Sequence, residues 1–203
     1  MVNAMPALTC TAFGGHRLLA SGPLRDVALA VRRAARAPDH APILIFDDAT
    51  GKAFDIDTRG SEREMLARLG PPPSAAPDEA SAAGEPAAPR GKGRPKLGVV
   101  AREVTLLPRH WEWLNAQPGG ASVALRKLVE EARRAHAGQD EQRRAREAAY
   151  HFMSAMAGDL PGFEEAARAL FAGDGERFAA LLRDWPADVR DYALRLAADA
   201  TPR

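Results

Sequence analysis

The segment from Pro71 to Pro89 constrains the fold more than any other feature, because it divides the chain of 203 residues into two parts. It reads PPPSAAPDEASAAGEPAAP and contains no aromatic and no branched aliphatic residue. Such a composition cannot bury enough apolar surface to offset the entropy that is lost on ordering. We therefore predict a disordered linker over residues 71–97, ending in a short basic arm, with ordered structure on both sides.

The residues before this linker, 1–70, predict a small α+β domain with the element order ββαββα. Two short strands flank a turn at Gly14-Gly15, which is typical of a hairpin. A helix with an apolar face starts near Pro23 and ends before Pro38. The remaining elements are two strands and a short helix, expected at Ile43 to Asp47, Lys52 to Asp57 and Ser61 to Leu69.

At the other end of the chain, residues 138–203 predict a helical C-terminal region. Apolar side chains recur there in four successive stripes, each of which marks one face of an amphipathic helix. The stripes run from Ala149 to Met156, Phe163 to Phe171, Phe178 to Trp185 and Val189 to Leu196. Four such faces suffice for a small bundle, or for a platform that packs on a protein partner.

The basic arm carries a cation at every second position, namely Arg90, Lys92, Arg94 and Lys96. Glycines between them let the backbone lie close to a narrow surface, and Pro95 keeps it extended. The core Gly93-Arg94-Pro95 resembles the AT-hook, a peptide that binds the strongly negative minor groove of A·T-rich DNA. The arm therefore predicts contact with DNA, and the alternative is a flexible basic tether.

The arm leads into residues 98–137, which predict one strand and two helices. Ala101 to Leu107 suits a strand, and Pro108 suits the first turn of a helix that ends at Pro118-Gly119-Gly120. Ser122 is the expected N-cap of the second helix, whose apolar stripe comprises Leu125, Leu128, Val129 and Ala132. A single strand is not stable alone, so we expect a second copy of the chain to pair with it in a homodimer.

This order of elements resembles the ribbon-helix-helix family over about a sixth of the chain, from Glu103 to Arg134. In that family two chains pair their strands into an antiparallel ribbon that enters the major groove of DNA, and four helices form the core. The resemblance implies that the backbone at the start of the second helix clamps a phosphate, which places three residues near DNA: Ala121, Ser122 and Val123.

The predicted strand departs from the usual ribbon of that family, in which polar or basic residues face the bases. If Thr105 and Leu107 face the core, Arg102 is the outward residue that can read a guanine edge. With the opposite facing, Glu103 would repel phosphates. The alternatives to a DNA-binding ribbon are a unit that only dimerises, or a strand that packs on the N-terminal sheet.

The whole chain also resembles a bacterial family of uncharacterised proteins. This resemblance depends on GRPKLGVVAREVTLLPRHWEWL, from Gly93 to Leu114, and on MSAMAGDLPGFEEAARALF, from Met153 to Phe171. It covers most of the chain and implies no particular activity.

No catalytic or metal-binding pattern is evident in the sequence. The five histidines have no metal-ligand spacing, and the lone Cys10 is best interpreted as a small buried residue. Four carboxylates surround a predicted turn, where solvated aspartate is usual: Asp47, Asp48, Asp55 and Asp57. We therefore expect a protein that is not an enzyme and that has no cofactor.

The net charge of +1 requires any affinity for nucleic acid to come from local clusters of cations. No apolar run is long enough for a membrane span, and the first residues do not form a signal peptide, so a cytoplasmic protein is expected. The sequence predicts a dimeric DNA-binding protein with a role in transcription regulation. The alternative is a non-catalytic module that dimerises and binds a protein through its C-terminal helices.

Overall fold

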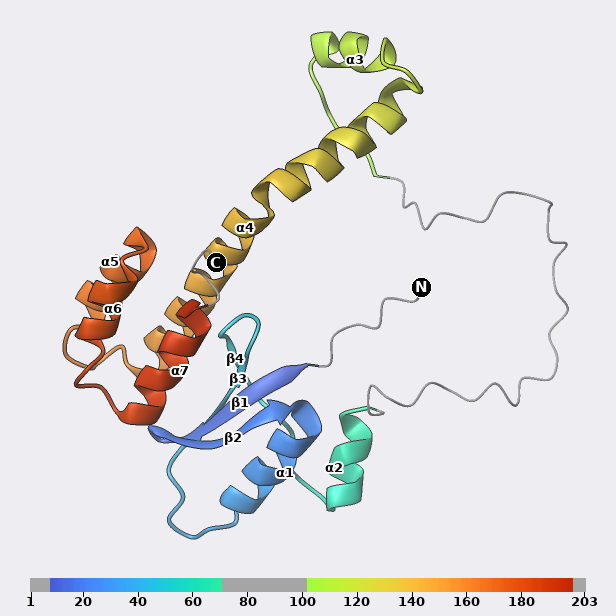
Figure 1. Cartoon of the computed structure of the whole chain (residues 1–203). Coiled ribbons are helices and arrows are strands. Elements are labelled where there is room, and N and C mark those ends of the chain that lie inside the picture. Colours follow the sequence, from blue (N-terminus) through green and yellow to red (C-terminus); the bar gives the residue numbers. More distant parts are fainter. Residues whose placement is uncertain (1–7, 71–101, 199–203) are drawn as a thin grey trace, which may run out of the picture. The chain divides into compact units, whose positions relative to one another are not determined.

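The computed structural model describes residues 8–70 and 102–198 (Figure 1). It is a mixed α+β structure with four strands and seven helices among these residues. Contacts divide them into two compact units: residues 8–70 and 136–198 belong to the first, and residues 102–135 to the second. The predicted linker and basic arm, residues 71–97, lie outside the described residues.

The first unit contains a four-stranded antiparallel sheet with the strand order β2-β1-β3-β4. The strands are β1 (Thr9–Gly14), β2 (Arg17–Pro23), β3 (Ile43–Asp47) and β4 (Ala53–Phe54). A turn at Gly15, where φ is 55°, joins β1 to β2 as the Gly-Gly pair predicts. Because β1 is a central strand with both faces covered, its residues from Cys10 to Phe13 are all buried.

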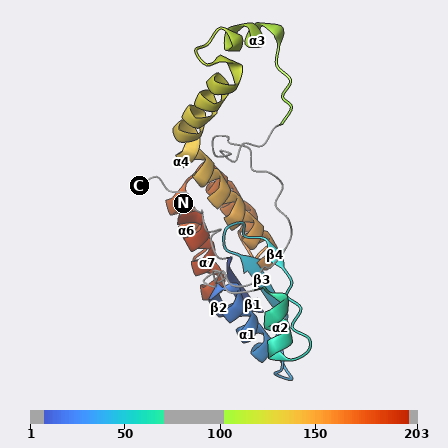
Figure 2. The same cartoon turned by 90° about the vertical axis from the view of Figure 1, so that its right-hand side faces the viewer.

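Helices α1 (Leu24–Ala34) and α2 (Glu62–Arg68) complete the predicted order ββαββα; both lie beside the sheet in Figure 2. α2 starts with a capping box, in which Ser61 Oγ accepts from the Glu64 N–H at 3.2 Å and Glu64 Oε2 accepts from the Ser61 N–H at 2.7 Å. α1 covers one face of the sheet through a cluster of apolar side chains: Cys10, Ala12, Val27, Val31 and Ile45.

The other face of the sheet packs against helices from the far end of the chain. They are the last part of α4 (Gly120–Met156), α5 (Phe163–Ala172), α6 (Gly175–Leu181) and α7 (Ala187–Ala198). Each contains one predicted stripe or its first part, since α6 ends at Leu181 and the third stripe was expected to continue to Trp185. Phe13 and Phe46 of the sheet belong to one cluster with Phe152 and Tyr192 of the helices. The N-terminal sheet and the C-terminal helices therefore share one core, although the sequence suggests separate regions.

α4 is a single helix of 37 residues, and this corrects the predicted second helix. We expected that helix to run from Ser122 to Arg134 and a separate region to begin at residue 138. Instead, the helix begins at Gly120 and continues through Gly138. A glycine inside a helix costs only about 1 kcal/mol relative to alanine, and the surrounding alanine, arginine and glutamate residues are strong helix formers.

The second unit begins with residues 102–107, which belong to no strand within the described chain. Over residues 102–107 the predicted strand is therefore not formed in a single copy, because a strand exists through hydrogen bonds to a neighbour. The predicted first helix is present as α3 (Pro108–Asn115), with Pro108 in its first turn. In the described part of the chain, no helix combines the length and apolar character that crossing a bilayer requires.

Candidate nucleic-acid interface and a buried polar network

The first helix of the second unit, α3, begins where extended chain changes to helix at Leu107 and Pro108. Leu107 is the N-cap of α3, with extended backbone angles of −66° and 149°, and Pro108 follows where its missing N–H costs nothing. On α3, Leu114 is buried and Trp111 is partly buried, whereas Trp113 is 53% exposed. The two tryptophans thus lie on different faces of the helix.

The turn between α3 and α4 depends on two glycines with left-handed backbone. Gly119 and Gly120 have φ of 86° and 72°, a region that other residues rarely adopt. α4 already begins at Gly120, so Ser122 lies inside the helix and is not its N-cap. Its carbonyl oxygen instead accepts a hydrogen bond from Arg126 Nε at 3.1 Å.

The residues that the sequence assigns to DNA fall into two groups. Arg90, Lys92, Arg94 and Lys96 lie outside the described residues. Arg102 and Ser122 are exposed, and Ala121 and Val123 are partly buried. Residues 121–123 are in the first turn of α4, where backbone N–H groups have no partner within the helix. The geometry at this position is therefore compatible with a phosphate, as the family resemblance implies.

The core of the second unit is incomplete in a single copy. Among its described residues, the buried ones are Leu114 and Ala124. Besides Trp113, four large aliphatic side chains stay 43–63% exposed: Val104, Leu107, Leu128 and Val129. A segment this small does not bury enough surface to fold alone, and the exposed side chains supply apolar area that a partner could cover.

A buried polar network in the first unit joins α7 to the sheet. At its centre is Thr11 of β1, which is fully buried. Thr11 Oγ1 donates to Asp48 Oδ1 at 2.7 Å, and the Tyr192 hydroxyl donates to the same oxygen at 2.7 Å. Arg195 Nη2 donates to Thr11 Oγ1 at 3.1 Å, and its guanidinium lies 4.6 Å from the centre of the Tyr192 ring.

The direction of each hydrogen bond follows from the chemistry of the groups. An ionised Asp48 carboxylate can only accept hydrogen bonds, so the Thr11 hydroxyl donates its single proton to Asp48. Ser21 Oγ lies 2.9 Å from Thr11 Oγ1 and must therefore donate to it. With Arg195 as a second donor, every hydrogen-bonding position of Thr11 is occupied. The network connects four segments, namely β1, β2, the turn after β3, and α7.

Two protonation states are set by these surroundings. Burial raises the pKa of the Tyr192 hydroxyl, and the hydrogen bond to Asp48 and the charge of Asp48 raise it further. Burial also raises the pKa of the Cys10 thiol to about 11, with smaller contributions from the charges of Asp48 and Asp47. Tyr192 therefore remains a donor at neutral pH, and Cys10 remains an unreactive thiol.

The sequence prediction did not identify this network. It treated Asp48 as a solvated turn residue, whereas the side chain is only 22% exposed. Asp47 does behave as a turn residue, since its Oδ1 accepts from the N–H groups of Ala49 and Thr50 at 2.7 and 3.2 Å. Among the described residues, no three potential metal ligands come together at either aspartate or elsewhere.

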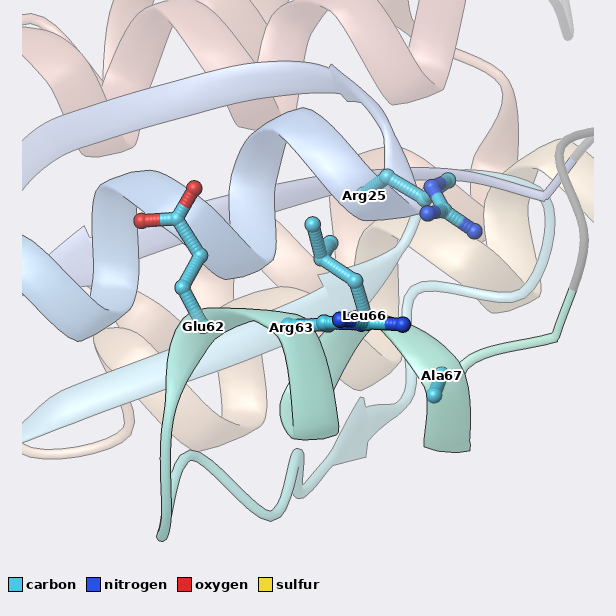
Figure 3. A pocket seen from close by; sticks show the side chains of 5 residues that line it. All are labelled: Arg25, Glu62, Arg63, Leu66 and Ala67. Carbon is cyan, nitrogen blue, oxygen red and sulfur yellow. The ribbon is translucent and has the colours of Figure 1, made fainter.

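A surface groove between α1 and α2 is lined by Arg25, Glu62, Arg63, Leu66 and Ala67 (Figure 3). In this view Leu66 stands between the Glu62 carboxylate and the Arg25 guanidinium. Arg25 Nη1 also donates to the carbonyl oxygen of Gly70, so it fixes the end of the α2 segment. The lining presents both signs of charge and favours no single class of ligand.

Comparison with curated proteins and with solved structures gave no match. A family model described as an uncharacterised protein conserved in bacteria matches residues 9–197, a range that includes both units. This match confirms the whole-chain resemblance, while the resemblance of residues 103–134 to ribbon-helix-helix proteins stays a prediction. The chain belongs to DUF2239, a family of uncharacterised proteins conserved in bacteria.

Proposed function

We propose that this protein is a dimeric DNA-binding protein of regulatory type, which acts through its second unit. The observation that carries the proposal is the incomplete core of that unit, where Val104, Leu107, Leu128 and Val129 remain exposed. A second copy would cover these side chains and would pair its residues 102–107 with those of the first. Two chains together would then form the ribbon and the four-helix core of a ribbon-helix-helix dimer.

The distribution of charge supports nucleic acid as the ligand. Residues 90–135 contain ten Lys and Arg against four Asp and Glu, whereas the rest of the chain contains 18 against 23. The second unit and the arm before it are thus strongly basic within a nearly neutral protein. Such a concentration of cations attracts phosphates and makes binding dependent on salt.

A gel-shift experiment on mixed genomic fragments, at low and at moderate salt, tests this proposal. We expect binding at low salt that weakens as salt increases, with a slope of roughly 0.9 in log K per phosphate contacted. Arg94→Ala should reduce affinity for A·T-rich fragments, and Arg102→Ala should reduce affinity or relax sequence preference. Arg183→Ala, an exposed residue of the first unit, is the matched control and should change nothing.

Two results would contradict the proposal. A protein that is monomeric at micromolar concentration in light scattering would exclude the shared ribbon. A clean dimer that binds no fragment even at low salt would exclude DNA as the ligand.

A dimer that binds no DNA would favour a protein-binding module. The first unit offers one specific feature for that role. Tyr150 and Phe171 are 36% and 50% exposed, with their ring centroids 5.4 Å apart. Phe163 extends this aromatic surface, with its ring centroid 6.2 Å from that of Tyr150. Exposed aromatic side chains are frequent at the centres of protein interfaces.

A further inference from the structure

One side of α4 carries a continuous seam of uncharged side chains, which recur at alternating spacings of four and three residues. The seam comprises seven positions between residues 121 and 142: Ala121, Leu125, Leu128, Ala132, Ala135, Gln139 and Gln142. All eight Asp, Glu, Lys and Arg residues of this stretch lie at other positions. Such a seam, sustained over about three heptads, is the pattern of a coiled coil, in which one helix packs along another.

The described chain leaves most of this seam uncovered. Between Ala124 and Ala145, which are both buried, no residue of α4 is buried by the described parts of one copy. This uncovered stretch corresponds to about 30 Å of helix. A helix in a protein obtains most of its stability from packing of its apolar face, so a partner along the seam would stabilise α4. The exposed seam positions are Leu128, Ala132, Ala135 and Gln139.

The charged side chains of α4 form ion pairs within one copy. Arg133 and Arg134 pair with Glu130, at 3.1 and 3.3 Å. Arg143 pairs with Asp140 at 2.9 Å. Such pairs at spacings of three and four residues are usual on a solvated helix surface. The polar side of α4 therefore suits water, whereas the seam suits a second helix.

We infer that α4 of a second copy packs along this seam as a parallel, in-register coiled coil. This inference rests on the proposed dimer and extends its contact beyond residues 103–134. In an isologous contact the same surface faces itself. A parallel coil is compatible with the antiparallel ribbon, because one two-fold axis can cross the ribbon and run along the coil.

The polar end of the seam favours the parallel arrangement. In register, Gln139 faces Gln139 of the partner subunit, and each amide can both donate and accept a hydrogen bond. An antiparallel pair centred between Ala132 and Ala135 would place Gln139 against Leu128 of the partner subunit. The amide would then be buried against an apolar side chain, which costs free energy unless it finds another partner.

The residues that flank the seam also fit this arrangement. Flanking residues on opposite sides of the seam face each other across a parallel coil, which brings Glu131 near His136 of the partner subunit. A carboxylate can accept a hydrogen bond from an imidazole N–H, so this contact is complementary. Val129 flanks the seam one heptad before His136 and would lose part of its 63% exposure.

A charge placed on the seam tests the contact, with a matched variant on the polar side of the helix. Ala132→Glu places like charges next to each other across the two-fold axis. We expect it to raise the dimer dissociation constant by roughly tenfold or more in analytical ultracentrifugation. Ala137→Glu makes the same change at an exposed alanine outside the seam and should keep the constant within about threefold of wild type.

Mixing Ala132→Glu with Ala132→Lys separates a lost contact from a lost fold. In the mixed dimer the two new charges are opposite and adjacent, so it should be roughly tenfold tighter than either variant with itself. A variant that had merely unfolded would not recover on mixing. Circular dichroism of each variant checks that helix content is kept.

A cysteine near the end of the seam determines the orientation. Gln139→Cys, in a chain that also carries Cys10→Ala, should form a disulfide between the two copies under mild oxidation if the coil is parallel. In the antiparallel pair the two cysteines would be 11 positions apart, because residue 139 would face residue 128. That separation is about 16 Å along the helix, too far for a disulfide. Ala137→Cys in the same background is the control and should not cross-link.

The inference is overturned if Ala132→Glu dimerises like wild type, if the mixture does not recover, or if Gln139→Cys does not cross-link. Failure of the proposed function is a different result. A wild-type dimer that binds no DNA, with seam variants that behave as expected, keeps the coil and removes DNA as the ligand. An Ala132→Glu variant that dimerises and binds DNA like wild type removes the coil and keeps the ribbon.

Discussion

At the scale of single residues, Gly51 has the least space for a side chain among the described glycines. It is buried in the turn between β3 and β4, and its φ of 64° lies in the left-handed region. A Cβ at this position would overlap the backbone carbonyl of Ala148 in α4. The turn therefore approaches the helix so closely that only a residue without a side chain fits.

Replacing Gly51 by alanine is expected to destabilise the protein by at least about 2 kcal/mol, because left-handed strain adds to a backbone clash. Urea unfolding monitored by circular dichroism measures the loss. Gly162→Ala is the matched control, since Gly162 has φ of 81° but no atom within 4 Å of a built Cβ. Equal losses for the two variants would show that the contact with Ala148 is unimportant.

The raised pKa of Cys10 predicts that the protein becomes less stable at alkaline pH. Its folded pKa of about 11 exceeds the ordinary value of 9.0, so the unfolded chain loses this proton first as pH rises. The buried thiol thus contributes its full stabilisation below pH 9. The free energy of unfolding then decreases by about 2 kcal/mol between pH 9 and 11. Urea unfolding between pH 9 and 10 should show the first part of this decrease in wild type, and Cys10→Ala should remove it. Above pH 10 the raised pKa of Tyr192 lowers the stability of both proteins. A decrease of the same size in Cys10→Ala would contradict the assignment.

At the scale of elements, α7 is attached to the sheet by two hydroxyl groups that share one carboxylate oxygen. Thr11→Val and Tyr192→Phe each remove one donor to Asp48 and keep the shape of the side chain. Each is expected to cost about 1–3 kcal/mol in urea unfolding, because a buried acceptor loses a partner. Tyr150→Phe, which changes an exposed hydroxyl, should stay within about 0.5 kcal/mol of wild type.

The double variant should lose more stability than the two single losses added together. After both changes the Asp48 carboxylate retains Arg195, 3.7 Å away, but neither neutral donor. Groups that share a partner usually couple by about 0.5–3 kcal/mol. Strict additivity would indicate that Thr11 and Tyr192 do not act on the same oxygen.

The elements of the first unit could be predicted because their signals are local. The glycine pair after β1 and the Ser61 and Glu64 pair before α2 each define a turn or a cap within a few residues. The network at Asp48 could not be predicted in this way, since Thr11 and Tyr192 are 37 and 144 positions away. One signal was present, namely a polar Thr11 in a strand whose neighbours are apolar.

In the candidate interface, the sequence predicts the local features but establishes neither the strand nor the length of α4. The helices, the Leu107-Pro108 transition and the glycine turn are local features, and the structure contains all of them. The strand at Ala101 to Leu107 requires a neighbour, so neither the sequence nor a single copy can establish it. The continuity of α4 through Gly138 was missed because one glycine is a weak signal against strong helix formers.

At the scale of the whole molecule, the two ends of the chain depend on each other. The side chains of Phe13 and Phe46 come from the sheet, and they pack around Phe152, whose ring centroid lies 5.3 and 4.9 Å from theirs. The residues before and after the second unit are therefore one folding unit, even though residues 71–135 separate them in sequence. Neither end is expected to be stable without the other.

Cleavage of the chain between Ala82 and Ala83, at an inserted protease site, tests this dependence. Fragments 1–82 and 83–203 should stay together in size-exclusion chromatography, because the shared aromatic core spans the cut. Phe152→Ala removes the central ring of that core, which typically lowers the free energy of unfolding by about 3–5 kcal/mol. This variant should release the fragments. Trp113→Ala, in the second unit, should leave them associated. Fragments that separate without any substitution would mean that the sheet and the C-terminal helices fold independently.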